Sequence, residues 1–291
     1  MSDLQSIPPA TTTPSSLSPE PLLIDAAGVL HRPVGAGARI VSLVPSLTEL
    51  LFDLGLGARL VGRTAFCVHP KDRVKTVSSV GGTKTINMRK LRRLAPTHAI
   101  VNIDETPRLL AEQLTAEGIE VVVTHPVEVA DNLTLYRLIG SVFGAEAAAE
   151  ALSERFRQAY STTIDAARGR PSRRVLYLIW KDPWMTVTRE TYVSRMLALA
   201  GWHTVPATAD RRYPAITLDE PLLTDVDLVL FASEPFPFQP RHIKAFRATH
   251  PGHAAKALAI DGEMVSWYGS RAVAGLAYLA ALVREHDVQR P

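Results

Sequence analysis

The chain has 291 residues, of which 46% are hydrophobic and 21% are charged, and its 32 Lys and Arg against 29 Asp and Glu give a formal net charge of +3. This composition is typical of a packed globular protein with one large or two smaller domains, and it excludes disordered and fibrous classes. A single cysteine, Cys67, excludes an internal disulfide framework and an all-cysteine zinc site. No apolar run approaches the ~18 residues that a membrane-spanning helix needs.

The first 20 residues carry no Lys or Arg and no apolar core, so they lack the elements of a secretory signal. They are rich in Ser, Thr and Pro, and we expect residues 1–21 to be disordered because they offer too little apolar surface to offset the entropy of ordering. On these residues, the sequence as written predicts a cytoplasmic location.

From Leu22 onward, short apolar runs alternate with amphipathic stretches, which is the pattern of an α/β protein. A small hairpin is expected over 22–34. Ser46 and Glu49 have the spacing of a capping box at the start of a helix, and this spacing accounts for Glu49 without a role at a ligand. The other elements expected in this half are strands at 40–44, 60–62, 98–102 and 120–124 and helices at 86–94 and 106–117.

Residues 145–168 are rich in Ala and Glu and contain neither Pro nor Gly, which predicts a helix about 36 Å long at 1.5 Å per residue. Beyond it, Thr217 and Glu220 repeat the capping-box spacing before a short helix. The other elements expected in this half are strands at 174–180, 227–232 and 257–260 and helices at 191–200, 240–249 and 270–286. We therefore expect two Rossmann-like α/β lobes, over 22–144 and 170–291, joined by a long rigid interlobe helix at 145–169.

Common enzyme motifs are absent from the sequence, among them GxGxxG, GxxxxGK[ST], GxSxG and HExxH. His250 and His253 enclose a Pro-Gly turn, which favours a solvated loop over a metal site. Cys67 and His69 could pair a thiol with an imidazole, but a nucleophile also needs an orienting group and an oxyanion site, and nothing nearby supplies them. We expect neither catalytic nor metal-binding residues.

Aromatic and proline-rich turns follow the strands of the second half, and all four tryptophans lie beyond residue 170. The segments are 180–184, 234–238 and 261–271. In open α/β sheets, ligands bind beyond the carboxyl ends of the strands, where large rings suit a flat, bulky ligand. We interpret the three loops as a binding surface, the alternative being that the rings only fill the ends of the sheet.

A series of short segments runs through the chain at 25–28, 39–51, 54–57, 60–62, 80–82 and 94–96, and the long helix at 145–168 follows them. Together they resemble the iron-siderophore/cobalamin-binding family, the class III periplasmic substrate-binding proteins of ABC importers. The resemblance covers about residues 22–287. Within the family, the segments 179–187, 233–238 and 261–271 are most similar to the cobalamin-binding branch, in the subgroup of helical-backbone metal receptors.

The resemblance implies a non-enzymatic, monomeric receptor that holds a ligand in the cleft between its lobes, with no catalytic cofactor. The ligand contacts that it implies are Pro45, Ser46, Phe66, Thr83 and Asn102 from the first lobe and Trp180, Trp184, Glu263, Trp267 and Tyr268 from the second. The family's cobalamin binders carry tryptophans where this chain has Thr83 and Asn102. The acidic position that contacts the corrin side chains falls on Glu263.

Family receptors also dock on arginines of a membrane permease through one acidic residue on each lobe. The second-lobe position falls on Asp219 or Glu220, but the first-lobe position falls on Arg89. The window 71–93 holds eight Lys and Arg and one Asp, a net charge of +7 that would oppose docking on a basic permease. We interpret this window either as a solvated face or as the site of a separate anionic partner. Nucleic acid is not expected, because no aromatic residues interleave the charges.

The function that the resemblance implies is binding of a corrinoid such as cobalamin, by the substrate-binding component of an ABC-type uptake system or by a cytosolic relative of one. Two alternatives stay open, a ferric siderophore or haem as the ligand, and a cytosolic enzyme or carrier in corrinoid handling. The location also stays open, because the resemblance implies the periplasm whereas the N-terminal residues predict the cytoplasm.

Overall fold

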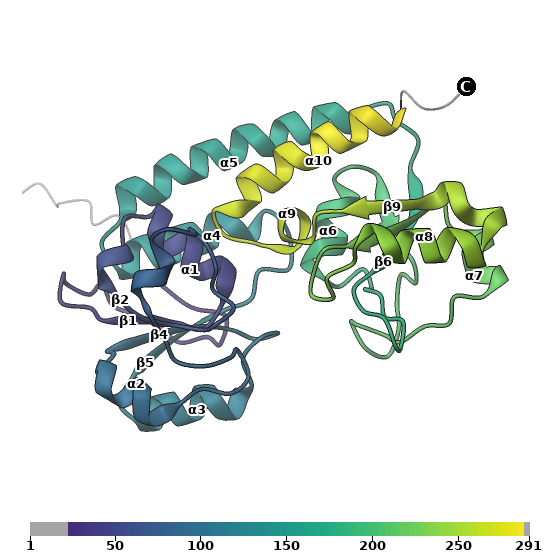
Figure 1. The fold of residues 1–291 in the computed structure, drawn as a ribbon. Coiled ribbons are helices and arrows are strands. Elements are labelled where there is room, and N and C mark those ends of the chain that lie inside the picture. The colour runs from purple at the N-terminus through teal and green to yellow at the C-terminus, as the bar shows by residue number, and fades with distance from the viewer. Residues whose placement is uncertain (1–22, 288–291) are drawn as a thin grey trace, which may run out of the picture.

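The computed structural model describes residues 23–287, so the disordered segment predicted for 1–21 lies outside it. Within the described residues, the chain forms two α/β lobes that lie side by side, each built on a parallel sheet (Figure 1). The predicted fold class is therefore confirmed. Among the helices of this part of the chain, none has the length and hydropathy needed to cross a bilayer.

The first lobe contains a five-stranded sheet with the order β3-β2-β1-β4-β5. Its central strand β1 is fully buried, as a continuous apolar run in a parallel sheet predicts. The strands are β1 (Ile40–Ser42), β2 (Leu60–Arg63), β3 (Ser78–Ser79), β4 (His98–Asn102) and β5 (Glu120–Thr124). The helices are α1 (Pro45–Asp53), α2 (Met88–Leu94), α3 (Arg108–Ala116) and α4 (Asp131–Val142), with short 3₁₀ turns η1 (Gly57–Arg59) and η2 (Val74–Thr76).

The second lobe contains a four-stranded sheet with the order β7-β6-β8-β9. Its strands are β6 (Arg173–Leu178), β7 (Trp202–Thr204), β8 (Leu228–Ala232) and β9 (Ala257–Ile260). Its helices are α6 (Tyr192–Ala198), α7 (Glu220–Asp225), α8 (Pro240–Thr249) and α9 (Gly262–Ser266), with the 3₁₀ turn η3 (Pro251–Lys256).

Two long helices, α5 (Glu146–Ala167) and α10 (Arg271–Asp287), lie against each other along the top of the molecule and span both lobes (Figure 1). Thr163 of α5 donates a hydrogen bond to the backbone oxygen of Leu276 in α10 at 2.9 Å. Gly275 lets α10 pass close to α9, because a Cβ there would lie 2.0 Å from the backbone oxygen of Met264. The predicted interlobe helix thus has a second helix beside it. We propose lobe limits at residues 144 and 170, on either side of α5.

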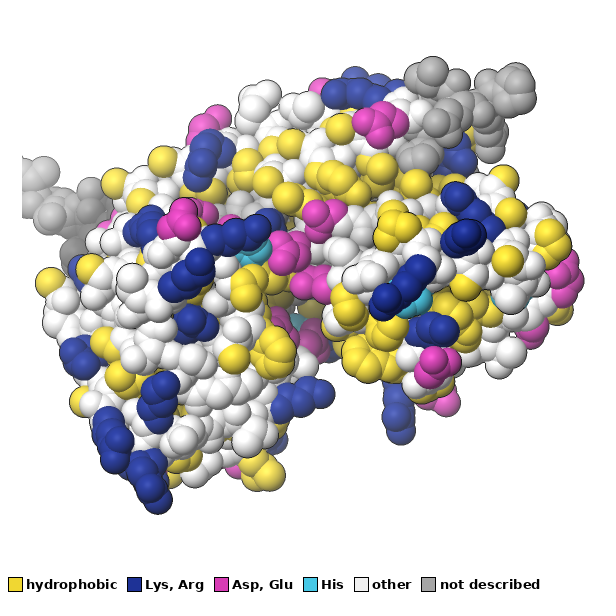
Figure 2. All heavy atoms as spheres, viewed as in Figure 1, with side chains coloured by type: hydrophobic (Ala, Val, Ile, Leu, Met, Phe, Trp, Pro, Cys, Tyr) yellow, Lys and Arg dark blue, Asp and Glu magenta, His cyan; other side chains and the backbone are white. Residues whose placement is uncertain are grey.

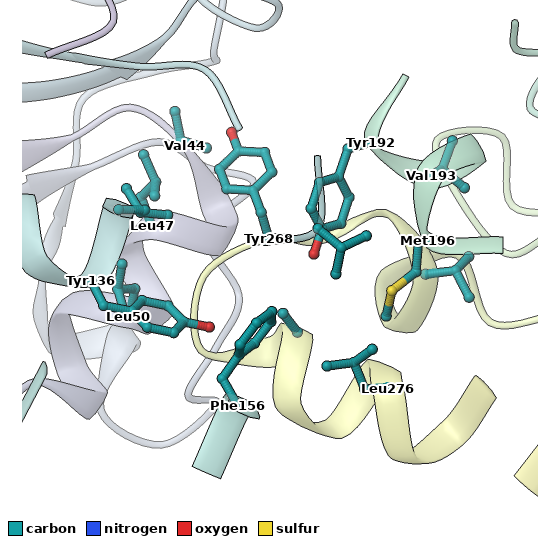
Figure 3. Close-up of a cluster of buried hydrophobic side chains, with 14 of the residues drawn as sticks. Val44, Leu47, Leu50, Tyr136, Phe156, Tyr192, Val193, Met196, Tyr268 and Leu276 are labelled. Carbon is teal, nitrogen blue, oxygen red and sulfur yellow. The ribbon is translucent and has the colours of Figure 1, made fainter. Parts of the chain in front are cut away.

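A continuous hydrophobic core joins the two lobes instead of ending at each of them. Figure 3 shows its centre, where Tyr268 lies between Val44 and Leu47 of the first lobe and Tyr192 of the second. Leu276 of α10 belongs to the same cluster. Burial of this apolar surface opposes separation of the lobes, since each buried Leu or Phe side chain contributes about 1.5–3 kcal/mol.

Both predicted capping boxes are wrong. Helix α1 begins at Pro45 after Val44, with no side-chain cap, and Ser46 already lies inside its first turn. Helix α7 is capped by Asp219, which accepts a hydrogen bond from the backbone N–H of Leu222 at 3.0 Å. In both cases a helix does begin near the predicted capping box, but the residue at its N-cap position is not the one that the spacing predicted.

The hairpin predicted over 22–34 is reduced to one antiparallel bridge between Ile24 and Leu30, with Gly28 at a φ of +79° in its turn. Asp25 closes this turn by accepting hydrogen bonds from the backbone N–H groups of Ala27 and Val29, both at 2.9 Å. The sequence analysis missed the short strands β3 and β7 and the helices α4 and α9.

Candidate functional site

The two lobes enclose a hollow, and Figure 2 shows acidic side chains and a histidine gathered at its inner end. Loops from both sheets meet there. In the first lobe these are the loops after β2 and β4, which carry His69 and Glu105, and in the second lobe it is the segment after β9, which carries Glu263 and Tyr268. We call this inner end the cleft floor and the exposed loops around its mouth the cleft rim.

Ion pairs tie the two lobes together at the cleft floor. Glu263 lies 2.9 Å from His69 of the first lobe, measured from Oε2 to Nε2. Arg271 donates two hydrogen bonds to the Glu49 carboxylate, at 2.7 and 2.6 Å, and its Nη1 lies 3.3 Å from Glu263 Oε2. Planar two-point pairing of this kind is the strong form of an ion pair. Glu49 therefore has a cross-lobe partner in place of the predicted capping role.

Tyr268 makes a second cross-lobe link, donating a hydrogen bond from its hydroxyl to Glu105 Oε1 at 2.8 Å. Burial raises the pKa of Glu105 to about 7, an effect that the Tyr268 hydrogen bond partly offsets and that the charges of Glu234 and Asp104 strengthen. Burial also raises the pKa of Tyr268 well above its usual value. Near neutral pH the Glu105 carboxyl group is therefore half protonated, and the tyrosine stays a donor.

Trp267 is held on three sides and is only 9% exposed. Its indole N–H donates a hydrogen bond to Glu234 Oε1, the Arg271 guanidinium lies 5.0 Å from its ring centre, and the His69 ring meets it edge-on at 5.6 Å. Burial raises the pKa of Glu234, while the Trp267 hydrogen bond lowers it. This ring therefore supports the cleft floor and offers little surface to a ligand.

Aromatic rings are exposed at the cleft rim. Trp180, after β6, is 41% exposed and meets Phe236 edge-on at 5.6 Å, and Phe66, after β2, is 62% exposed. Trp184 differs, because its ring stacks on Phe238 at 6.0 Å and lies against the core of the second lobe. Of the two predicted ligand contacts in this segment, Trp180 is therefore exposed, whereas Trp184 is partly covered by its own lobe.

The remaining predicted contacts of the first lobe differ in accessibility. Pro45 and Thr83 are half-buried, whereas Ser46 and Asn102 are buried. Asn102 closes the turn after β4, since its Oδ1 accepts a hydrogen bond from the Asp104 N–H at 2.8 Å.

Sequence reasoning missed several residues that build the cleft floor, namely Glu49, His69, Glu105, Glu234 and Arg271. Glu234 and Arg271 stand in segments that the sequence analysis did single out, but the cross-lobe partners of Glu49, His69, Glu105 and Arg271 lie far away along the chain. A further cross-lobe pair joins Arg212 to Asp104 at 2.7 Å, with His125 at 3.3 Å from the same guanidinium.

Neither rejected chemical site is assembled in the structure. Cys67 is buried and bonded to Thr48 and Thr64 at 3.0 and 3.1 Å, and burial raises the pKa of its thiol. His253 lies 2.9 Å from Glu220, away from His250, whose ring stacks on Phe246. Between residues 23 and 287, no three His, Cys, Asp or Glu side chains are grouped to hold a metal ion.

Comparison with known proteins yields one family and a consistent set of similar proteins. The family model described as "Periplasmic binding protein" matches residues 40–255. A vitamin B12-binding protein of Yersinia pestis (strain Pestoides F) is 26% identical over 193 residues, which cover 66% of this chain and 68% of that protein. One of Yersinia pseudotuberculosis serotype O:3 (strain YPIII) is 28% identical over 187 residues, 64% of this chain and 65% of that protein.

Two solved structures have the same fold. The periplasmic vitamin B12 binding protein BtuF of Vibrio cholerae aligns with a TM-score of 0.76 at 18% identity, over 87% of this chain and 99% of that one. The periplasmic heme-binding protein RhuT of Roseiflexus sp. RS-1 aligns with a TM-score of 0.74 at 23% identity, over 86% and 99%. The family match covers most of the described fold. The chain belongs to the periplasmic binding protein family, and it is a binding protein, not an enzyme.

Proposed function

We propose that this protein is a receptor that holds a corrinoid such as cobalamin in the cleft between its lobes, as the substrate-binding component of an ABC-type uptake system or as a cytosolic relative of one. The relatives named as vitamin B12-binding proteins support this ligand class. The observation that carries the proposal is the exposed indole of Trp180, which stands at the carboxyl end of β6 with Phe236 fixing its orientation.

A flat macrocycle gains from such a ring because stacking removes apolar surface of both partners from water. Trp180 is already oriented by Phe236, so little side-chain freedom is lost when a ligand covers it. Phe66 occupies the corresponding place on the first lobe, where its ring lies against Gly82. The two rings give the ligand one aromatic contact from each lobe.

Haem is the second candidate, because a solved structure with this fold is named as a heme-binding protein. Charge at the cleft floor favours the corrinoid. The charge of Glu234 helps to raise the pKa of Glu105, and the cations Arg212 and Arg271 already pair with Asp104 and Glu49. The carboxylates of haem would meet like charge there, whereas the amide N–H groups of a corrinoid would meet acceptors.

Docking on a membrane permease has weak support from the second lobe. The two predicted positions there already have partners, because Asp219 caps α7 and Glu220 lies 2.9 Å from His253. Glu220 is nevertheless largely exposed, so it is the residue that we propose for such a contact. Arg89 at the first-lobe position opposes it.

The proposal is tested by titrating the purified protein with cyanocobalamin, dicyanocobinamide and haem. Calorimetry and quenching of tryptophan fluorescence measure the binding. We expect a corrinoid to bind and Trp180→Ala to weaken that binding by about thirtyfold, a loss of about 2 kcal/mol. Arg157→Ala, on the outer face of α5, is the matched control and should leave affinity unchanged.

Three results are informative beyond affinity. Binding of haem but neither corrinoid would favour the second candidate. Absence of heat and quenching with all three would reject the proposal. Recovery of chemically altered corrinoid after incubation would contradict the proposal, since a receptor returns its ligand unchanged.

A further inference from the structure

The basic window of the first lobe forms one continuous edge of the molecule. Its strand β3 is the outermost of the five-stranded sheet, and η2, the turn at 81–85 and α2 surround it. Figure 2 shows Lys and Arg side chains spread over the face and the lower end of this lobe. The eight cations, which we call the basic edge, are all exposed and are Lys71, Arg73, Lys75, Lys84, Arg89, Lys90, Arg92 and Arg93.

Most of these charges have no partner in the fold. Arg92 pairs with Glu117, and Arg73 lies over the Phe52 ring at 4.7 Å. Within residues 23–287, the other six make no ion pair or side-chain hydrogen bond. Because the whole chain is only +3 and the window is +7, the remaining residues carry a net −4. The protein is therefore electrically polarised, and an anionic surface would attract it with this edge first.

Two exposed apolar side chains stand beside the cations. Phe66 and Val68 are 62% and 46% exposed, in the loop just before Lys71. This loop is anchored to the basic edge, because the Ala65 N–H donates a hydrogen bond to the Gly81 oxygen at 2.6 Å and the Phe66 ring lies 3.5 Å from the Cβ position of Gly82. Lys84 follows in the same turn.

This combination fits a lipid surface better than other anions. The cations spread over three elements on long flexible side chains, and within residues 23–287 six of them have no ion pair or side-chain hydrogen bond to fix their positions. A fluid layer of headgroups satisfies such a distribution, and exposed apolar side chains beside basic ones are typical of segments that lie in the membrane interface. A nucleic acid would be expected to need aromatic residues between the charges.

We propose that the basic edge docks the protein on an anionic lipid bilayer, with Val68 entering the headgroup layer. The loop after β2 belongs to the cleft rim, so docking turns the first-lobe side of the cleft mouth toward the membrane. This proposal goes beyond ligand binding and does not depend on which ligand the cleft holds.

Co-sedimentation with vesicles tests it, using phosphatidylcholine alone and phosphatidylcholine with about a third phosphatidylglycerol. We expect binding only to the anionic vesicles and its loss at about 1 M salt, where the Debye length is about 3 Å. The variant Arg89→Ser/Lys90→Ser/Arg93→Ser should lower partitioning by ten- to a hundredfold, following the usual contribution of one basic residue near an anionic surface. The matched control, Arg211→Ser/Arg241→Ser/Lys244→Ser, removes the same charge from exposed positions of the second lobe and should retain binding.

Equal binding to both vesicle types, or equal loss in the two triple variants, would overturn the proposal. So would stronger binding to poly-glutamate or to duplex DNA than to the vesicles at the same salt, because the partner would then be a protein or a nucleic acid. Thermal unfolding of both variants shows whether they keep the fold. We expect that they do, because the substituted side chains are exposed. A Val68→Ser variant that binds the anionic vesicles severalfold more weakly than the wild type at low salt would support insertion of the loop, because this substitution changes no charge.

Discussion

The cleft floor and the cleft rim use their side chains in opposite ways. At the floor, Glu49, Arg271, His69 and Glu263 all pair across the lobes, and the floor side chain Trp267 is almost fully buried. At the rim, Trp180 and its first-lobe counterpart stay exposed and contact only their own lobe. The floor therefore fixes the distance between the lobes before any ligand arrives, whereas the rim keeps its apolar surface available.

The difference predicts that changes at the floor alter stability and changes at the rim alter binding. The largest effect is expected for Arg271→Met, which leaves the largely buried Glu49 carboxylate without its cation and leaves Glu263 with His69 alone of the two partners described above. Breaking a buried pair in this way lowers the free energy of unfolding by about 3–5 kcal/mol, and slight exposure here places the value near the lower end. Urea denaturation measures it.

The matched control is Arg157→Met, which breaks exposed pairs with Glu150 and Glu154 and should lower stability by less than about 1 kcal/mol. The double variant Glu49→Gln/Arg271→Met should recover part of the loss, because the unpaired charge is removed with its partner. If Arg271→Met is no less stable than Arg157→Met, the floor does not hold the lobes.

An intermediate effect is expected for Trp267→Phe. Phenylalanine keeps an aromatic ring but removes the indole N–H, which leaves the half-buried Glu234 with the weaker hydrogen bond from Ser266 and should lower the free energy of unfolding by about 1–3 kcal/mol. Trp180→Phe at the rim also removes an indole N–H, but from an exposed ring, and should change the free energy of unfolding by only a few tenths of a kcal/mol, roughly as for other surface substitutions. Similar losses in the two variants, measured by thermal unfolding, would erase the distinction between floor and rim.

The smallest effect concerns pH and Glu105. The pKa of this carboxyl group is about 7 in the folded protein against 4.5 in the unfolded chain, so folding takes up a proton between these values. Its contribution to stability is complete below pH 4.5 and is lost as the pH rises through 7. Since the side chain is only half-buried, we expect a loss of about 1 kcal/mol.

Unfolding of the wild type and of Glu105→Gln between pH 5 and pH 8 measures this contribution. The amide is neutral throughout and still accepts the Tyr268 hydrogen bond, so the variant should become more stable relative to the wild type as the pH rises. A difference that stays constant over the range would show that Glu105 remains charged in the folded protein.

Elements with a strong, long pattern were predicted well from the sequence. The helix expected at 145–168 is α5, one residue shorter at each end, and the strand expected at 257–260 is β9 with the same bounds. Strands β3 and β7 have only two and three residues, which is too short for a period of two to be visible. The two capping-box predictions were wrong because two residues at the right spacing do not determine at which residue the helix begins.

The candidate site was predictable where its residues stand in recognisable loops. Trp180 and Trp184 share one segment, yet only packing against Phe238 distinguishes the half-buried Trp184 ring from the exposed Trp180 ring. The floor was not predictable, because local spacing gave Glu49 a complete explanation, and the segment 261–271 was singled out without any sign that Arg271 pairs with Glu49. Pairs of this kind are set by how the lobes meet, and a single sequence carries no direct signal of that contact.

The pairing of Glu49 with Arg271 also has a consequence for synthesis. The two residues are 222 positions apart, and at about 5–20 residues per second the ribosome needs roughly 10–45 s to pass from one to the other. During that interval the first lobe can form its sheet, but α10, which packs against α5 and carries the cation that pairs with Glu49, has not yet been synthesised. The surface around Glu49 therefore stays open to chaperones and proteases until the second lobe has left the ribosome. It is covered only when α10 has packed against α5 and both lobes.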